Sequence, residues 1–270
     1  MTLALPDIAI PPDLARDEMP DLLRHWYLGP RARRHMMMRR FAEVDRHLDL
    51  AAGRRVLDVG SAWGFNVMAL NRLGFEAVGV DIVPDQFPVG KRIAEYNHIP
   101  FDVAGADARA LPFADASFDH VTLVETFEHI FAEDRPRAVA ECFRVLRPGG
   151  RIVLSTPNHA SLVERAKRVA VRHRWIRAKL PSMCYPDLGT AREDYHPYRY
   201  HRPLPDREIV ALLSDAGFRI ARVSHFLFML KSTPDAMYAP WSALENLSER
   251  TPGLRGVAAT VCVSATRPSP

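Results

Sequence analysis

Short apolar runs alternate with helical patterns along the chain after Gly53. Alternation of this kind, with buried apolar strands, predicts a parallel, doubly wound α/β sheet. Right-handed crossover connections would then place helices on both faces of that sheet. The predicted strands are residues 55–59, 77–80, 101–103, 119–124 and 151–155, and the predicted helices lie near 65–73, 89–97 and 137–146.

The same pattern continues near the C-terminus. Pro136 suits the first turn of the helix at 137–146, because proline is tolerated where no backbone donor is needed. A further helix is predicted over 206–216. Residues 219–230 and 257–265 are rich in Val, Ile, Phe and Thr, which favour strands. The predicted sheet therefore has seven strands.

Two segments fall outside this alternation. Residues 1–50 have a helical and peripheral character, and 31–50 contain neither Pro nor Gly. Residues 157–204 follow the fifth predicted strand and fit neither strand nor helix of the repeat. We therefore expect an N-terminal helical cap, a core made of 51–156 and 205–270, and an insertion that forms a lid or covers the acceptor site.

Composition limits the class of protein. The chain has 270 residues, of which 47% are hydrophobic and 25% charged, as in ordinary globular proteins. No run reaches the roughly 18 to 20 apolar residues of a membrane-spanning helix, and residues 1–12 do not resemble a secretory signal. Cys142, Cys184 and Cys262 are scattered, without metal-binding spacing. A reducing, cytoplasmic location is therefore expected.

Positive charge is unevenly distributed. The net charge is +4, yet residues 161–180 contain seven Lys or Arg and a single Glu. A second basic cluster lies within residues 31–40. Both clusters are compatible with a solvated helical face. They are equally compatible with an anionic partner, which could be a membrane surface, a phosphate-bearing substrate or nucleic acid.

The turn after the first predicted strand has the sequence Asp-Val-Gly-Ser-Ala-Trp-Gly at residues 58–64. Glycine lets the backbone approach a ligand, and the following helix points its N-terminus at the ligand. Asp81 ends the second strand, where an acid can accept hydrogen bonds from ribose hydroxyls. A dinucleotide fingerprint would need glycine at 60, 62 and 65, but Ala62 and Phe65 stand at two of these positions.

This turn resembles the D/E-x-G-x-G-x-G signature of class I S-adenosylmethionine-dependent methyltransferases. Further segments resemble that family in the same order, over roughly residues 50–160 and 205–266. They are 105–108 with 111–113, 117–121, 125–129, 145–150 and 155–158. The resemblance implies a Rossmann-like, seven-stranded, mostly parallel sheet with an antiparallel final strand.

The resemblance also implies S-adenosylmethionine as cofactor and S-adenosylhomocysteine as product. Asp81 matches the acid that binds ribose, and Asp107 matches the acid near the adenine amino group. Ala62 replaces the usual central glycine, and we expect little crowding there if its φ stays negative. The predicted cofactor-binding residues are Asp58, Gly60, Ser61, Ala62, Gly64, Asp81, Ile82, Asp107, Ala108 and Glu125.

Methyl transfer from a sulfonium depends mainly on alignment, and a base is needed only when the acceptor must lose a proton. His129 lies after the fourth predicted strand, and histidine titrates near neutral pH. It is a candidate base, although it could instead fix the start of a helix. His196 and His201 are the other candidate bases. The predicted substrate-binding residues are Glu128, Asn158, Tyr195, Tyr198 and Arg199.

A metal ion is an alternative at this turn. The order Glu125, Glu128, His129 and Asn158 resembles the ubiquinone-biosynthesis O-methyltransferase branch, for which a divalent cation near a catechol has been inferred. Carboxylates and imidazole can ligate such an ion. The same turn also occurs in branches without a metal. We therefore expect none, and keep Glu125, Glu128 and His129 as the alternative ligand set.

The insertion contains two patterns. Residues 161–180 place apolar residues on one helical stripe among basic residues, which suits either a membrane interface or a lid packed on the core. In related quinone O-methyltransferases an insertion at this place is associated with membrane contact and substrate cover. Residues 193–202 are dense in aromatic residues, His and Arg, and are a candidate acceptor wall.

The sequence thus predicts methyl transfer to oxygen or nitrogen of a small acceptor, which would be a natural product, quinone-like or lipid-like. A nucleic-acid or protein methyltransferase is the nearest rival, but the chain lacks an Asn-Pro-Pro-aromatic motif and a separate RNA-binding module. A non-catalytic, membrane-peripheral binding module with the same fold is the rival from another class. The sequence carries no signal for an oligomeric state.

Overall fold

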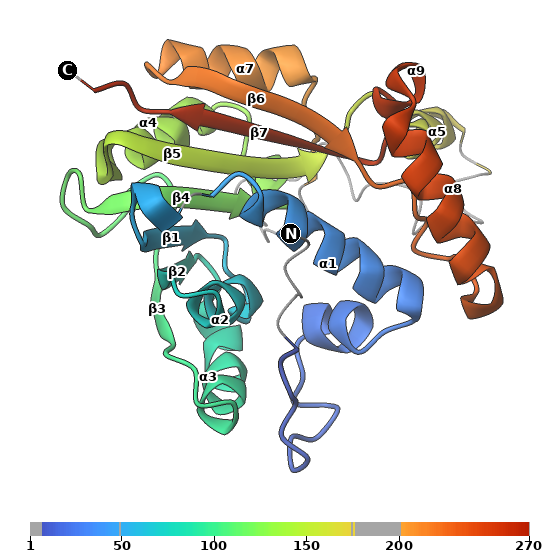
Figure 1. The fold of residues 1–270 in the computed structure, drawn as a ribbon, viewed down its shortest axis with the longest axis horizontal. Helices are drawn as coiled ribbons and strands as arrows, with labels where there is room; N and C mark the ends of the chain where they lie inside the picture. Colours follow the sequence, from blue (N-terminus) through green and yellow to red (C-terminus); the bar gives the residue numbers. More distant parts are fainter. Residues whose placement is uncertain (1–6, 49, 174, 176–200, 270) are drawn as a thin grey trace.

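The computed structural model describes residues 7–48, 50–173, 175 and 201–269. Its centre is a seven-stranded sheet in the order β3-β2-β1-β4-β5-β7-β6 (Figure 1). The strands are β1 (Arg55–Val59), β2 (Glu76–Asp81), β3 (Asp102–Gly105), β4 (Phe118–Val124), β5 (Leu146–Pro157), β6 (Arg219–Phe226) and β7 (Thr260–Thr266).

The sheet is mostly parallel. Strand β1 pairs in parallel with β2 and β4, and the neighbours β3 and β5 continue that direction. Strand β7 runs antiparallel to both β5 and β6. The predicted fold class, with its antiparallel final strand, is therefore confirmed. Central strands such as β1 and β4 are buried along nearly their whole length, which explains why most of their residues are apolar.

Helices cover both faces of the sheet. On one face, α4 (Arg135–Val145) and α7 (Asp206–Asp215) pack residues such as Val139 and Ile209 against the strands. On the other face lie α1 (Arg31–Asp45), α2 (Phe65–Arg72) and α3 (Phe87–Tyr96). The remaining helices are α5 (Leu162–Arg172), α8 (Tyr238–Arg250) and α9 (Pro252–Arg255), with short turns η1 (Leu23–Tyr27), η2 (Leu50–Ala52), η3 (Pro84–Gln86), η4 (Phe127–His129) and η7 (Asp235–Met237).

Helix α1 is tied to the sheet by buried polar contacts. The Ser224 hydroxyl donates to Glu43 Oε1 over 2.8 Å, and His47 Nδ1 lies 2.9 Å from the Ser264 hydroxyl. Burial alone would raise the pKa of Glu43, but hydrogen bonds from His47 and Ser224 and the charge of Arg46 hold it at about 2. The carboxylate is therefore ionised at neutral pH, and it anchors the helix that forms one wall of the cavity described below.

Helix boundaries differ slightly from the predicted ones. Helix α4 begins at Arg135 rather than 137, so that Pro136 lies inside its first turn. Helix α1 ends at Asp45 instead of continuing to 50. The predicted strand at 219–230 ends at Phe226, because Leu227 adopts a φ of +73° that takes the chain out of the sheet. The predicted strand at 257–265 begins at Thr260.

Helices α8 and α9, between β6 and β7, were not predicted. In Figure 1 they lie at one end of the sheet, beyond the ends of β6 and β7. The buried residues of α8 are Glu245 and Ser248, whereas Leu244 and Leu247 are exposed. An amphipathic pattern that predicts a helix places apolar residues on the buried face. This helix reverses that pattern, so its sequence gives no such signal.

Part of the predicted insertion can be compared with the structure. Its residues Leu162–Arg172 form α5, with Ser161 as N-cap accepting a hydrogen bond from the Glu164 amide. On the predicted apolar stripe, Leu162 is 64% exposed and Val169 is 54% exposed. In the described part of α5 the stripe is therefore not packed on the core. None of the described helices is both long and apolar enough to cross a membrane.

Candidate active site

A cavity of about 940 Å³ opens at the carboxyl ends of β1, β2 and β4. Its floor comes from the turns that follow these strands, and its walls come from α1, α5 and residues 229–232. Ligands of open α/β sheets bind at this edge. The volume is at the upper end of the range for small-molecule sites, so it has room for a cofactor and an acceptor together.

The β1–α2 turn needs glycine at two positions. Gly60 has a φ of +81°, and Gly64 caps α2 with a φ of +88°. A Cβ on Gly60 would collide with the side chain of Thr126. The amides of Gly60 and Ser61 both donate to Val80 O, over 2.8 and 3.0 Å. The turn is thus held against β2, with Gly60, Ser61 and Ala62 on the cavity wall.

Asp81 fixes this turn from the neighbouring strand. Its Oδ2 accepts a hydrogen bond from the Ala62 amide and its Oδ1 accepts one from the Val83 amide, each over 2.8 Å. Burial raises its pKa, although these backbone donors oppose the shift. Asp81 and Ile82, which the sequence analysis predicts to bind the cofactor, both lie on the cavity wall.

Asp58 and Gly64 support the turn from outside the cavity. Asp58 is fully buried, and its Oδ1 accepts a hydrogen bond from the Thr122 hydroxyl over 2.7 Å. Burial raises the pKa of Asp58 to about 6. Its Oδ2 has no hydrogen-bond partner within the part of the chain that the structure describes. Neither Asp58 nor Gly64 lines the cavity, so both shape the turn without contacting the cavity.

Asp107 and Ala108 border the cavity near the end of β3. The Asp107 carboxylate accepts hydrogen bonds from Arg109 Nε, over 2.9 and 3.0 Å. Arg109 also pairs with Asp134 over 2.9 Å. This network orients the carboxylate at the rim of the cavity, and Arg109 is a partner that the sequence did not indicate.

Ala62 does not keep the negative φ that we expected. Its φ is +49°, in the left-handed region. A side chain there brings Cβ close to the following carbonyl, at a cost of roughly 1–2 kcal/mol per residue. Alanine is therefore strained at this position. The turn imposes a positive φ, which suits the glycine that usually stands here.

We expect Ala62→Gly to stabilise the protein by about 0.5–1 kcal/mol. Glycine removes the left-handed strain, while its greater freedom in the unfolded chain cancels roughly half of the gain. Urea unfolding should show a higher midpoint at unchanged slope. Ala69→Gly, inside α2, is the matched control and should destabilise. A lower midpoint for Ala62→Gly would show that the turn does not strain alanine.

Glu125 lies between the cofactor turn and α1. Its φ is +54°, and its Oε2 lies 2.9 Å from Nη2 of Arg40 on α1. Burial raises its pKa to about 7, although the Arg40 charge opposes the shift. Glu125 Oε1 and Arg40 Nε are buried without hydrogen-bond partners among the described residues. Both side chains line the cavity, so these two atoms are available to a ligand.

Arg40 is a site residue that the sequence analysis did not single out. It belongs to the basic cluster at residues 31–40, whose members look alike in sequence. Only Arg40 of that cluster lines the cavity. Its guanidinium also lies 5.4 Å from the ring centre of Trp26, another cavity residue. The sequence therefore indicates a cluster of arginines at this place, but it does not distinguish Arg40 from the other members.

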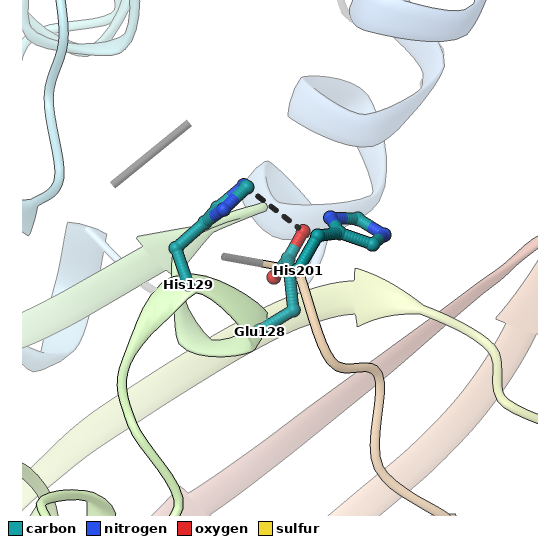
Figure 2. Close-up of side chains that lie close together, drawn as sticks. All are labelled: Glu128, His129 and His201. Carbon is teal, nitrogen blue, oxygen red and sulfur yellow. Dashed lines mark ion pairs between the residues drawn. The ribbon is translucent and has the colours of Figure 1, made fainter. Parts of the chain in front are cut away.

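Three titratable side chains meet deeper in the cavity. Figure 2 shows His129 and His201 on either side of the Glu128 carboxylate. Glu128 Oε2 accepts a hydrogen bond from the Thr156 hydroxyl over 2.9 Å, and Oε1 lies 3.9 Å from His129 Nε2. The two imidazole ring centres are 5.2 Å apart. The fold thus brings residue 201 next to the turn after β4.

One potential ligand atom from each of these three residues lies within 4.8 Å of the others. Two imidazoles and a carboxylate can hold a divalent transition metal ion. Glu125 is not part of this group, so the close set differs from the predicted alternative of Glu125, Glu128 and His129. Among the described residues no other cluster of this kind occurs.

The protein environment shifts the pKa values of Glu128 and His201 in opposite directions. Burial raises the pKa of Glu128 to about 7. Burial, followed by the charges of His129, Lys167 and Arg40, lowers the pKa of His201 to about 2. His201 is therefore neutral at physiological pH and a weak proton acceptor. Of the described candidate bases, His129 is the better placed.

The remaining predicted site residues do not meet in the described cavity. Asn158 is fully buried outside it, donating to the carbonyls of Gly256 and Ala258 and accepting from the Ala160 amide. It joins the end of β5 to the segment before β7. Tyr195, His196, Tyr198 and Arg199 lie outside the described residues.

Comparison with known proteins agrees with this geometry. A family model described as a methyltransferase domain matches residues 57–154. A demethylmenaquinone methyltransferase from Thermus thermophilus is 40% identical over 114 residues, covering 40% of this chain and 51% of the relative. A ubiquinone biosynthesis O-methyltransferase from Xanthomonas oryzae pv. oryzae is 28% identical over 239 residues, covering 87% of this chain and 88% of the relative. The chain spans about half the length of the first curated relatives that it matches.

The fold is also found among solved structures. An S-adenosylmethionine-dependent methyltransferase from Thermotoga maritima superposes with a TM-score of 0.61 at 18% identity, covering 92% of this chain and 95% of that one. At this identity the likeness concerns the fold alone. The matched domain covers β1 to β5 and thus the turns that line the cavity. These findings show a methyltransferase domain over residues 57–154, in a fold similar to that of S-adenosylmethionine-dependent methyltransferases.

Proposed function

We propose that the chain transfers a methyl group from S-adenosylmethionine to an oxygen or nitrogen of a small acceptor with an apolar, quinone-like or lipid-like body. The observation that carries this proposal is a single cavity lined by both the Gly60 turn with Asp81 and the Glu128–His129–His201 group. The names of the matched relatives, a ubiquinone biosynthesis O-methyltransferase and a demethylmenaquinone methyltransferase, support a quinone-like acceptor.

The residues of the turn fit the cofactor. The cavity offers Asp81 for ribose hydroxyls and Asp107 with Ala108 for the adenine. The Ser61 hydroxyl is buried without a hydrogen-bond partner among the described residues, as expected of a group waiting for a ligand. When bound, the cofactor supplies a methyl group that its sulfonium already activates.

Arg40 and Glu125 fit the amino-acid end of the cofactor. A guanidinium pairs well with a carboxylate, and a carboxylate oxygen accepts hydrogen bonds from an ammonium group. Their free atoms, Arg40 Nε and Glu125 Oε1, are buried next to the turn. The ion pair between them holds both side chains in place before the ligand arrives. We assign these two residues to the methionine part.

His129 is placed to take the proton of the acceptor. Its charge would act on Asp81 and Glu125, which are assigned to the cofactor, and on His201 beside Glu128, so it lies near both parts of the cavity. Glu128, 3.9 Å away, would stabilise the imidazolium that results. Alignment of the acceptor against the apolar wall would supply the rest of the rate enhancement.

Peripheral membrane contact through residues 161–180 remains part of this proposal, as does a cytoplasmic location. Its support is α5, which exposes Leu162 and Val169 beside the exposed cations Arg165 and Arg172. A basic amphipathic helix of this kind suits an anionic lipid surface. Such a contact would bring the cavity close to a lipid-like acceptor.

The function is tested with purified protein, S-adenosylmethionine and three acceptors: 3,4-dihydroxybenzoate, a short-chain demethylated quinol and histamine. We expect S-adenosylhomocysteine to bind in isothermal titration calorimetry, and methylated product to form with at least one acceptor by mass spectrometry. If the protein binds S-adenosylhomocysteine but methylates only tRNA or protein added in parallel, the acceptor class is wrong. If the protein binds no S-adenosylhomocysteine, the non-catalytic binding module is the better description.

A further inference from the structure

A short loop after β6 forms one rim of the cavity. Leu227 turns the chain with its positive φ, and residues 229–232 then line the cavity. Glu245 on α8 accepts hydrogen bonds from the amides of Phe228 and Met229, over 2.7 and 2.6 Å. Glu249 accepts one from the Leu227 amide over 2.9 Å. Two carboxylates of one helix therefore hold the loop by its backbone.

The same two glutamates are tied to α1. His35 Nε2 lies 2.7 Å from Glu245 Oε1, and Arg39 Nη2 lies 2.6 Å from Glu249 Oε2. Glu245 is only 2% exposed, and these partners keep its pKa low against the effect of burial. The loop is thus fixed to the helix that also carries Arg40. Its side chains at positions 230 and 231 have a defined place at the rim.

One cation of the cavity lining has no acidic partner among the described residues. Besides Arg109, which pairs with Asp107 and Asp134, three cations line the cavity, namely Arg40, Lys167 and Lys231. Arg40 pairs with Glu125 over 2.9 Å, and Lys167 pairs with Glu164 over 2.7 Å. Lys231 forms no ion pair with any residue that the structure describes. Two of the three cations are thus matched within the protein, and the third is not.

The surroundings of Lys231 confirm that cations dominate there. Partial burial, and then the charges of Lys167 and Arg33, lower the pKa of Lys231. Among the described residues, no carboxylate opposes this shift. The cavity lining also includes apolar side chains such as Met36, Met37 and Val163. An anion on an apolar molecule would match both features, because it would pair with the lysines while its body covers the apolar wall.

We propose that the acceptor carries an anionic group, and that Lys231 and Lys167 bind this group at the rim of the cavity. The inference rests on the proposed function, since it names the acceptor class of the same site. A carboxylate, a phosphate and a sulfonate share the relevant chemistry. The loop held by Glu245 would thereby set acceptor specificity, by keeping Lys231 opposite the reacting end.

The test uses two fluorescent probes that share a ring system. 8-Anilinonaphthalene-1-sulfonate carries the anion, and N-phenyl-1-naphthylamine lacks it. We expect Lys231→Gln to weaken binding of the sulfonate about tenfold, the size of one charge-assisted contact, and to leave the neutral probe unchanged. Lys231→Arg should retain the binding. Lys91→Gln, at an exposed site of α3, is the matched control and should alter neither probe.

Equal effects of Lys231→Gln on the two probes, or no effect on the sulfonate, would overturn the inference. Calorimetry with S-adenosylhomocysteine on the same proteins separates it from the proposed function. If wild-type protein binds no S-adenosylhomocysteine, the proposed function fails. If that binding is normal in every variant while the probes show no discrimination, only the anionic acceptor is excluded. Circular dichroism of each variant checks that it folds.

Discussion

Replacement of Asp81 by alanine is expected to weaken binding of S-adenosylhomocysteine by about 100-fold or more. The carboxylate would contact the ribose, and it also holds the Ala62 and Val83 amides. Each charge-assisted hydrogen bond contributes about 1.5–3 kcal/mol, and 1.4 kcal/mol corresponds to a factor of ten. Asp81 would contact the ligand and also holds the turn. Its replacement should therefore cost more binding free energy than the loss of a single hydrogen bond. Isothermal titration calorimetry measures the change.

Asp102→Ala is the matched control for Asp81→Ala. Asp102 is an exposed carboxylate at the start of β3, paired in register with Val78 of β2 and away from the cavity. We expect wild-type affinity for this variant. If Asp81→Ala kept an affinity within threefold of wild type (about 0.7 kcal/mol), the assignment of the ribose site to this strand end would be wrong.

The second large effect is expected at His129. Replacement by alanine should lower kcat by about 10²–10³, the usual contribution of a positioned base. Binding of S-adenosylhomocysteine should stay within a few-fold of wild type, because His129 is not assigned to the cofactor. Single-turnover methylation of 3,4-dihydroxybenzoate, or of whichever acceptor proves active, measures the change. An unaltered kcat would leave alignment as the sole source of catalysis.

The pH dependence of kcat tests whether Glu128 is the group that stabilises the His129 imidazolium. The pKa of Glu128 is raised to about 7, so its carboxyl is neutral below that pH and ionised above it. Only the carboxylate stabilises an imidazolium, and kcat should therefore rise with pH through about 7. Glu128→Gln is neutral at every pH. It should lower kcat and remove the part of the rise that comes from Glu128, whereas an unchanged profile would assign the ionisation to another group, such as the base itself.

The cofactor half of the site could be predicted because its signals are local. Gly60, the acid at position 81 and the strand ends before them follow one another within short segments. A parallel sheet then brings their carboxyl ends to one edge. The positions of Asp81, Ile82, Asp107 and Ala108 at the cavity agree with that prediction. The apolar strands and the antiparallel last strand are confirmed for the same reason.

Contacts between distant segments could not be predicted in this way. Arg40 meets Glu125 only because α1 packs across the sheet, and no local pattern distinguishes Arg40 from its neighbouring arginines. His201 is a candidate base from the sequence, but burial beside other cations lowers its pKa to about 2, so it is a weak base. The left-handed φ of Ala62 is imposed by its turn and is invisible in the residue itself.

The sequence by itself thus determined the class of fold and the positions of the glycine turn and of the acids at the strand ends, because strand periodicity and glycine turns depend on neighbouring residues. Only the tertiary structure decided which charges face one another. Helix α8 buries Glu245 and leaves Leu244 and Leu247 exposed, so its burial follows from its partners on α1 and the loop after β6. Protonation, strain and the excess charge at Lys231 depend on burial and distance, which arise only when the chain has folded.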